Sequence, residues 1–301
     1  MSGDAGQGIE SVGAALSRTL ARSGLHVFAT QDFRSRIRGG HNFYQVRMSN
    51  TPVQAQRDPP NLLLAFTRET IDLHMDRLAA GAGVVYDASL GVDEAQLRSH
   101  GLHPVPVPLT KIAADHGSRV MTNIAGLGAL AGVIRLPLAG LNKVIREEFA
   151  GKGPEVVAAN LAVARDARRY VDRAFPDAGW PIPDGDGVRR LLLHGNHALA
   201  LGAVAAGCRF IAAYPMTPAT TILEYLAGPS TGLPTRTEQA DLLFAVHAGQ
   251  GEFPRIVLAP GTVEQCFEAG WRAFNLADRY QCPVIVLSDL FLAGALQPVD
   301  P

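Results

Sequence analysis

Two loops in the second half of the chain carry residue types that can bind a polar small molecule. One is YPMTP at Tyr214–Pro218, and the other is GPSTGLPTRTEQADL at Gly228–Leu242. Glycine and proline fix the backbone of such loops, so that hydroxyl and free N–H groups can point at an anion. We therefore expect both loops to belong to a binding site.

Regular structure on either side is expected to position the first loop. CRFIA at Cys208–Ala212 predicts a strand, which brings YPMTP to its carboxyl end, where open parallel sheets bind ligands. A helix is predicted after Pro218, because threonine caps helices and proline is favoured in their first turn. The alternative role of Thr217 is structural, as the cap of that helix.

An arginine-rich segment near the amino terminus is a second candidate binding region. Arg34, Arg36 and Arg38 alternate, so an extended backbone would place their guanidinium groups on one side. Arginines beside a Gly39-Gly40 turn can bind a phosphate or a carboxylate bidentately. The candidate cofactor-binding residues here are Arg36, Arg38, Gly39 and Gly40. A solvated edge strand is the alternative interpretation.

The glycine-rich turn GDAGQG at Gly3–Gly8 precedes a predicted helix at Ile9–Ser23. Gly24 is expected to end this helix, and Leu25–Ala29 to form a buried strand. Such a turn can present N–H groups to a phosphate. We expect no strand before it in so few residues, so a purely structural turn is an equal alternative.

The remaining pattern predicts an α/β fold with a mostly parallel sheet covered by helices. Phe175–Gly187 is rich in Pro, Gly and Asp, which is typical of a linker. We expect a domain boundary at about residue 180, with domains at 1–180 and 188–301. Further predicted strands are 43–48, 61–65, 83–86, 103–107, 189–193, 255–258 and 283–287, and predicted helices are 69–80, 123–134, 138–149, 152–172, 197–206, capped by Asn196, and 263–279.

Composition excludes several functional classes. The 301 residues carry a formal net charge of -1, and aromatic residues are not interleaved with basic clusters, so we expect no nucleic-acid binding. No CxxC pair occurs, which argues against a metal or iron–sulfur cluster held by this chain. We expect neither a signal peptide nor a membrane span, and a cytoplasmic location. His74, His100, His103 and His116 share no ligand spacing and are interpreted as surface or satisfied residues.

Ordered phrases along most of the chain resemble one enzyme family. They include GDAGQGIESVG, FATQDFRSRIRGGHNFYQVR, GNHALALGAVAAGCRFIAAYPMTPATTILEY, GPSTGLPTRTEQADLLFA and FNLADRYQCPVIVLSD. The family is the alpha subunit of 2-oxoacid:ferredoxin (acceptor) oxidoreductases, in the form with a gamma domain fused at its amino terminus. The resemblance implies a gamma-type α/β domain, then the pyrimidine-binding domain of a thiamine diphosphate enzyme.

The resemblance also implies a reaction and its participants. Such enzymes decarboxylate a 2-oxoacid such as pyruvate or 2-oxoglutarate on thiamine diphosphate, pass two electrons to ferredoxin and transfer the acyl group to coenzyme A. A beta subunit normally supplies the diphosphate and Mg²⁺ site and an iron–sulfur cluster, so we expect a hetero-oligomer. The implied substrate-binding residues are Tyr214, Pro215, Thr217, Pro218, Gly228, Ser230, Thr231, Gly232 and Thr235, with Thr217 and Thr235 in catalytic roles.

The chain departs from the family pattern in two ways. Leu226 stands where the family has an arginine that pairs with the substrate carboxylate. Ala227 runs directly into Gly228, whereas the family has several βα units between the two loops, including the glutamate that protonates the aminopyrimidine. The family's carboxyl-terminal domain is also expected to be missing. We therefore predict an internally shortened alpha subunit with little or no turnover.

Two other functions stay open at this point. One is a non-catalytic module that docks on a beta-type partner or binds coenzyme A through the Arg34–Arg38 segment. The other is an independent NAD(P)-type α/β enzyme that uses the GDAGQG turn, which the expected lack of a preceding strand disfavours.

Overall fold

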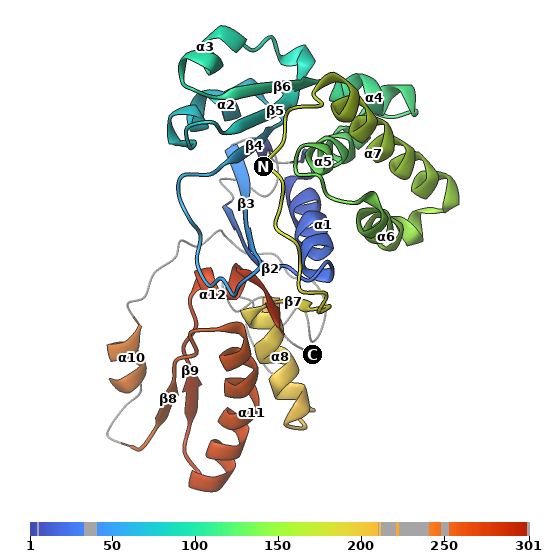
Figure 1. Ribbon diagram of the computed structural model, residues 1–301. Helices are drawn as coiled ribbons and strands as arrows, with labels where there is room; N and C mark the ends of the chain where they lie inside the picture. Colours follow the sequence, from blue (N-terminus) through green and yellow to red (C-terminus); the bar gives the residue numbers. More distant parts are fainter. Residues whose placement is uncertain are drawn as a thin grey trace. The chain divides into compact units, whose positions relative to one another are not determined.

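The computed structural model describes residues 1–4, 6–32, 41–209, 211, 221–222, 241–247 and 253–299. The chain divides into two compact units, unit 1 at Met1–Arg190 and unit 2 at Leu191–Pro301 (Figure 1). Strands and helices alternate along both units, so the predicted α/β class is confirmed. No helix among the described residues is both long and apolar enough to cross a membrane.

Unit 1 is built on a mixed sheet with the strand order β6-β5-β4-β1-β3-β2. Strands β1, β4, β5 and β6 run parallel, while β3 is antiparallel to both β1 and β2. The strands are β1 (Ser2–Asp4), β2 (His26–Asp32), β3 (His41–Ser49), β4 (Leu62–Ala65), β5 (Gly83–Asp87) and β6 (His103–Val107).

Helices lie on both faces of this sheet, because alternate residues of each strand point to opposite sides (Figure 1). On one face, Ile71 and Leu97 pack with Leu63 of β4. On the other face, Leu64 lies against Gly126. The helices are α1 (Ile9–Arg22), α2 (Arg68–His74), α3 (Glu94–Ser99), α4 (Leu109–Asp115), α5 (Thr122–Val133), α6 (Leu138–Phe149) and α7 (Pro154–Ala174), with short 3₁₀ turns at Met75–Arg77, Ala88–Leu90, Arg119–Met121 and Ala150–Lys152.

A strand does precede the glycine turn, so the expectation of none was wrong. Although β1 has three residues, Ser2 pairs with Phe43 of β3 on one side and with Ala65 of β4 on the other. Hydrogen bonds from two neighbours stabilise a segment that is too short to form a strand by itself. As predicted, Gly24 ends α1: its φ is 84°, and Leu25 N donates to Leu20 O at 3.2 Å.

The small residues of α5 allow α7 to approach closely. Residues 124–133 of α5 are all buried. Gly128 lies against the backbone of Ala164, and Gly132 lies against Val171. A glycine costs helical stability through its backbone entropy, but here it permits contact between two helix backbones that a side chain would separate.

The segment predicted as a linker is held by unit 1. Trp180 N donates to Val133 O at 2.8 Å, its indole Nε1 donates to Gly81 O at 3.1 Å, and its ring lies on Gly83. Further along, Arg190 Nη2 donates to Asp186 Oδ2 at 2.5 Å, and this bond, with an added backbone bond from Val188, lowers the pKa of Asp186 to about 2. These contacts hold the segment to the first unit, which ends at Arg190.

Unit 2 contains two short strand pairs. Strand β7 (Leu191–His194) pairs antiparallel with β10 (Leu296–Val299), and β8 (Ile256–Leu258) pairs parallel with β9 (Val284–Val286). Its helices are α8 (Gly195–Ala205), α10 (Leu242–His247), α11 (Val263–Tyr280) and α12 (Leu290–Gly294). Helices α8 and α11 meet at Gly202 and Gly270, where each glycine lies on the other helix's backbone.

Two sequence expectations for unit 2 differ from the structure. Asn196 does not cap a helix, because α8 begins one residue earlier, at Gly195, with His194 in the cap position. The described residues of the strand predicted at 208–212, which are Cys208, Arg209 and Ile211, lie in no strand.

We predict that Gly128→Ala destabilises unit 1 by about 1–3 kcal/mol, because the added methyl group forces α5 and α7 apart. Gly140→Ala in α6 is the matched control, since its methyl group would lie 3.4 Å from Thr19 and replaces another helical glycine. Urea unfolding of both variants measures the difference. Equal stability of the two variants would show that the α5–α7 contact does not require a glycine.

Candidate functional site

All of the predicted site residues lie outside the described part of the chain. This holds for the substrate and catalytic candidates Tyr214, Pro215, Thr217, Pro218, Gly228, Ser230, Thr231, Gly232 and Thr235, and for the cofactor candidates Arg36, Arg38, Gly39 and Gly40. The described residues that flank them show which elements these segments connect.

The arginine segment connects two strands beside the carboxyl end of β1. The chain leaves β2 at Asp32 and enters β3 at His41, and Asp32 pairs with Phe43. His41 in turn pairs with Asp4, the last residue of β1. The glycine turn follows Asp4 directly, so the two ends of the arginine segment and the start of the glycine turn belong to one edge of the sheet.

Side-chain and backbone bonds hold the glycine turn in a tight conformation. Gln7 Oε1 accepts a hydrogen bond from Asp4 N at 2.8 Å, and Gln7 N donates to Asp4 O at 3.2 Å. Gly6 and Gly8 have φ of 93° and 72°, which disfavours a side chain at either position. The Asp4 N–H is thus already bonded within the turn. Gly8 stands at the N-cap of α1 and provides no side-chain hydrogen bond to the first turn. The backbone N–H groups of that turn are therefore the groups that could bind an anion.

A polar cluster of Ser2, His41 and His74 lies next to this turn. His41 Nε2 is 3.0 Å from Ser2 Oγ and 2.6 Å from His74 Nε2. One of the two facing imidazole nitrogens must be unprotonated to accept a hydrogen bond from the other. Burial, with a smaller contribution from the charge of His41, lowers the pKa of His74 to about 4. The cluster therefore contains a neutral His74 at neutral pH.

Sequence patterns pointed to only two of the three residues of this cluster. His41 follows Gly39-Gly40 directly, and His74 was expected to be a surface or satisfied histidine, which agrees with its contact to His41. No local pattern pointed to Ser2, because its hydrogen-bond partner His41 is 39 residues away along the chain.

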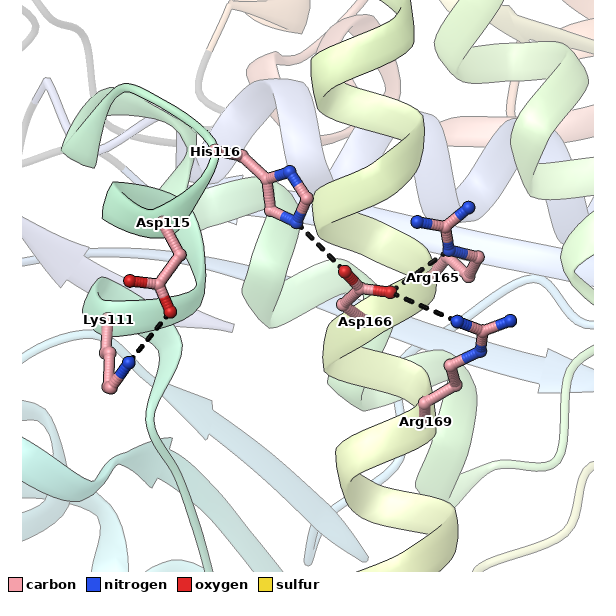
Figure 2. Close-up of polar contacts among 6 residues, drawn as sticks. All are labelled: Lys111, Asp115, His116, Arg165, Asp166 and Arg169. Carbon is pink, nitrogen blue, oxygen red and sulfur yellow. Dashed lines mark hydrogen bonds and ion pairs between the residues drawn. The ribbon is translucent and has the colours of Figure 1, made fainter.

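A second polar cluster connects α4 to α7. His116 Nε2, just after α4, lies 2.9 Å from Asp166 Oδ2 on α7, whose Oδ1 accepts from Arg165 Nε at 3.0 Å (Figure 2). Burial opposes ionisation of Asp166, but the hydrogen bonds from Arg165 and His116 outweigh it and lower the pKa of Asp166. His116, Arg165 and Arg169 all contact the carboxylate of Asp166 (Figure 2), and we assign the cluster a structural role.

In unit 2, Asn196 Nδ2 donates to Thr221 Oγ1 at 2.5 Å and so joins α8 to the residues after the YPMTP loop.

None of the described carboxylates of unit 2 is a buried acid of the kind that a thiamine aminopyrimidine needs as its hydrogen-bond partner. Asp289 accepts from Leu292 N at the start of α12, and the other four are exposed: Asp241, Glu264, Glu268 and Asp278. In the described ranges, no three His, Cys, Asp or Glu side chains are grouped to hold a metal ion.

Two family sequence models match this chain. The pyruvate ferredoxin/flavodoxin oxidoreductase model matches residues 1–170, and the thiamine diphosphate-binding model of the pyruvate flavodoxin/ferredoxin oxidoreductases matches residues 226–301. The first match covers more than half of the chain and lies within unit 1, and the second lies within unit 2.

Similar proteins cover nearly the whole chain. The 2-oxoacid:ferredoxin oxidoreductase 2 subunit alpha of Aeropyrum pernix is 25% identical over 418 residues, with 98% of this chain and 65% of the relative. The 2-oxoglutarate oxidoreductase subunit KorA of Mycobacterium tuberculosis is also 25% identical, over 98% of this chain and 61% of the relative. A solved 2-oxoglutarate:ferredoxin oxidoreductase from Magnetococcus marinus, with 2-oxoglutarate, coenzyme A and succinyl-CoA bound, has a TM-score of 0.90 and 29% identity, over 100% of this chain and 64% of that one.

The alignment with the Aeropyrum relative is much longer than this chain. Because this chain has 301 residues, at least 117 of the 418 aligned positions have no counterpart in it. The chain thus spans about two thirds of the length of these relatives and lacks residues within the matched region, as predicted. That the missing positions form one block between Ala227 and Gly228 stays a prediction.

We predict that Gly8→Ala destabilises unit 1 by about 1–2 kcal/mol, because an alanine is strained at a φ of 72° and its methyl group would overlap the side chain of Asn123. Gly151→Ala is the matched control, with no atom near the added methyl group. Thermal unfolding measures both. A Gly8→Ala chain as stable as the control would contradict the tight turn described above.

Lowering the pH is expected to destabilise unit 1 through His74. The unfolded chain takes up a proton at this histidine near pH 6.5, whereas the folded unit does so only near pH 4. The stabilisation is therefore complete above about pH 6.5 and is lost as the pH falls toward 4. His74→Gln should lose less stability over this range than the unchanged chain.

The measurement is urea unfolding at pH 7.5 and 4.5, followed by the fluorescence of Trp180 in a Trp271→Phe background. His100→Gln, at an exposed histidine of the same unit, is the control. An identical acid-induced loss in the His74→Gln chain and its parent would exclude this role.

Proposed function

Because the chain belongs to the pyruvate ferredoxin/flavodoxin oxidoreductase family, we propose that it is an alpha-type subunit of a 2-oxoacid:ferredoxin oxidoreductase, in an internally shortened form. The reaction of the complete enzyme would be the oxidative decarboxylation of a 2-oxoacid, with electron transfer to ferredoxin and acyl transfer to coenzyme A. The proteins compared above are named as oxidoreductases of 2-oxoacids in general or of 2-oxoglutarate, and the Aeropyrum and Magnetococcus names include ferredoxin.

The observation that carries this proposal is the likeness along the full chain to the Magnetococcus enzyme, with a TM-score of 0.90. That structure contains 2-oxoglutarate and coenzyme A, ligands of the two kinds that the loops of this chain were expected to bind. The match extends over both units, which favours an alpha-type subunit with a gamma-type domain at 1–180 and a partial pyrimidine-binding domain at 188–301.

The two loops of unit 2 would bind the 2-oxoacid. Thr217 would donate its hydroxyl proton to the carboxylate or the keto oxygen, and Thr235 would face the same substrate. Ser230 and Thr231 would shape the second loop. Hydroxyl donors of this kind stabilise an oxyanion more strongly as negative charge develops on it.

Unit 1 would bind coenzyme A through Arg36, Arg38 and the Gly39-Gly40 turn. Support comes from the flanking residues: the segment joins β2 to β3 beside the carboxyl end of β1, next to the start of α1. Arginine binds phosphate bidentately, and N–H groups at a helix start attract anions.

Other components would come from partners. A beta subunit would supply the Mg²⁺ and diphosphate site for thiamine diphosphate together with an iron–sulfur cluster, and ferredoxin would accept the electrons. When bound, thiamine diphosphate stabilises the carbanion that forms on decarboxylation. We place the resulting hetero-oligomer in the cytoplasm.

Catalysis by this chain is expected to be slow or absent. The described carboxylates of unit 2 are exposed or bonded at the start of α12, so none of them provides a buried acid for the aminopyrimidine. Glu224, Glu238 and Glu252 lie outside the described residues. Leu226 also removes the positive charge that would pair with the substrate carboxylate.

A second candidate function is a non-catalytic module that docks on a beta-type subunit or binds coenzyme A. Two observations favour it. More than a hundred positions of the alignment with the Aeropyrum relative are absent from this chain, and the family match to unit 1 covers residues 1–170. Under this proposal unit 1 keeps its ligand and unit 2 has lost its chemistry.

The test is calorimetry of thiamine diphosphate with Mg²⁺ on this chain co-purified with its beta-type subunit, followed by an assay of 2-oxoacid-dependent ferredoxin reduction. We expect a complex with weak cofactor binding and little turnover. Thr217→Ala should weaken binding of the 2-oxoacid by roughly 10-fold or more through the loss of one charged hydrogen bond, and Thr217→Ser should restore most of it.

Different outcomes separate the proposals. Cofactor binding that Glu252→Gln abolishes would mean that another carboxylate has replaced the missing one and that the shortened enzyme is active. A complex that binds coenzyme A but no thiamine diphosphate would support the docking module. Failure to form any complex would contradict both.

A further inference from the structure

A groove of about 440 Å³ lies between α4 and α7 of unit 1. Ile112 of α4 borders it on one side, and its other lining residues all belong to α7. These are Asp166, Arg169, Tyr170, Arg173 and Ala174. The volume is in the range of sites that bind a small organic molecule. We call this feature the α4–α7 groove.

Two contacts hold the walls of the groove in place. His116 Nε2, just after α4, lies 2.9 Å from Asp166 Oδ2 on α7 (Figure 2). The ring of Tyr170 lies against the ring of Phe175, with centroids 6.4 Å apart and planes inclined at 58°. The first contact joins α4 to α7, and the second restricts the rotamers of a tyrosine that is 37% exposed.

The lining residues of α7 form two neighbouring rows along the helix. Arg169 and Arg173 are four residues apart, so they lie one turn apart on the same face. Tyr170 and Ala174 have the same spacing and form the adjacent row, with Ile112 across the groove. A row of guanidinium groups therefore runs beside an apolar row.

The groove carries more positive than negative charge. Of its lining residues, all of which are described, Asp166 is the only acid. Both of its oxygens already have partners, because Oδ2 contacts His116 and Oδ1 contacts Arg165. Arg169 adds a longer contact of 3.6 Å to Oδ1. The single charge of Asp166 is thus shared among several cations.

Arg173 supplies charge that the fold does not compensate. Its side chain is exposed, and no described residue forms an ion pair with it. The adjacent acid Asp172 is bonded to Arg168 at 2.9 Å. On α4, Lys111 and Asp115 are bonded to each other at 2.8 Å and add no net charge (Figure 2).

We propose that the α4–α7 groove binds a small aromatic carboxylate. The carboxylate would accept hydrogen bonds from Arg169 and Arg173, since a guanidinium group binds a carboxylate through two parallel bonds. The ring would lie over Tyr170 and against Ile112, where aromatic contact adds to the burial of apolar surface. This site is separate from the residues assigned to the 2-oxoacid and coenzyme A, and it does not rest on the proposed function.

The test uses 3-phenylpropionate, titrated into the full chain and followed by the amide chemical shifts of Tyr170 and Ala174. Two related molecules separate the two parts of the site: 3-phenylpropanol has the ring without the carboxylate, and acetate has the carboxylate without the ring. We expect saturable shifts with 3-phenylpropionate and at least about tenfold weaker binding of either related molecule.

Three variants test the residues that carry the proposal. Arg173→Gln should weaken binding of 3-phenylpropionate by at least about tenfold through loss of a charged hydrogen bond. Tyr170→Leu should weaken it by roughly 2- to 10-fold, because the aromatic contact is lost while an apolar side chain remains. Arg146→Gln, at an exposed arginine of α6 that does not line the groove, is the matched control and should bind like the unchanged chain.

An absence of saturable shifts with 3-phenylpropionate would overturn the proposal. Equal losses in Arg173→Gln and Arg146→Gln would do so too, as would equally tight binding of 3-phenylpropanol. Inorganic phosphate that binds as tightly as 3-phenylpropionate, without loss in Tyr170→Leu, would assign the groove to simple anions and would also overturn it. None of these variants alters a residue assigned to substrate or cofactor binding, so failure here leaves the proposed function untouched.

Discussion

Strand β1 is three residues long, yet it pairs on both sides, and the arrangement of unit 1 depends on this pairing. Ser2 joins β3 and β4 into one sheet, and Asp4 places the glycine turn beside His41. The helix α1 starts from that turn and packs against β3 through Gly13 and Tyr44. The same pairing brings His41, at one end of the arginine segment, beside Asp4, from which the glycine turn leads to α1.

Close backbone contacts are the second constraint on this molecule. In unit 1, α5 and α7 meet at Gly128, and in unit 2, α8 and α11 meet at Gly202 and Gly270. Such contacts exclude side chains from the helix interface, so van der Waals contact between backbones replaces the usual interdigitation. The same glycines that lower helix propensity therefore determine which helices can be neighbours.

Polar groups in unit 1 are mostly engaged in the fold. Asp166 is bonded to His116 and Arg165, Asp186 to Arg190, and the neutral His74 to His41. The 2-oxoacid and coenzyme A binding that we propose therefore depends on loops between the regular elements, as is common for enzymes built on rigid α/β scaffolds. In unit 2 the described carboxylates leave the activating acid of a thiamine enzyme unassigned. Membership of the family does not by itself establish that this chain keeps the family's chemistry.

The sequence alone predicted those helices and strands whose periodicity and end residues lie within one short segment. The helix at Leu138–Phe149 and the strand at His103–Val107 have the predicted bounds, because periodicity and end signals lie within each segment. The ordered phrases also identified the family. Tertiary structure alone decided that Ser2–Asp4 is a strand, that Ser2, His41 and His74 form one cluster, and that Trp180 anchors the predicted linker to β5. These features depend on partners 33 to 99 residues away along the chain. Local propensity carries no information about such pairings, because the free energy that stabilises them arises only when the sheet and its helices are assembled.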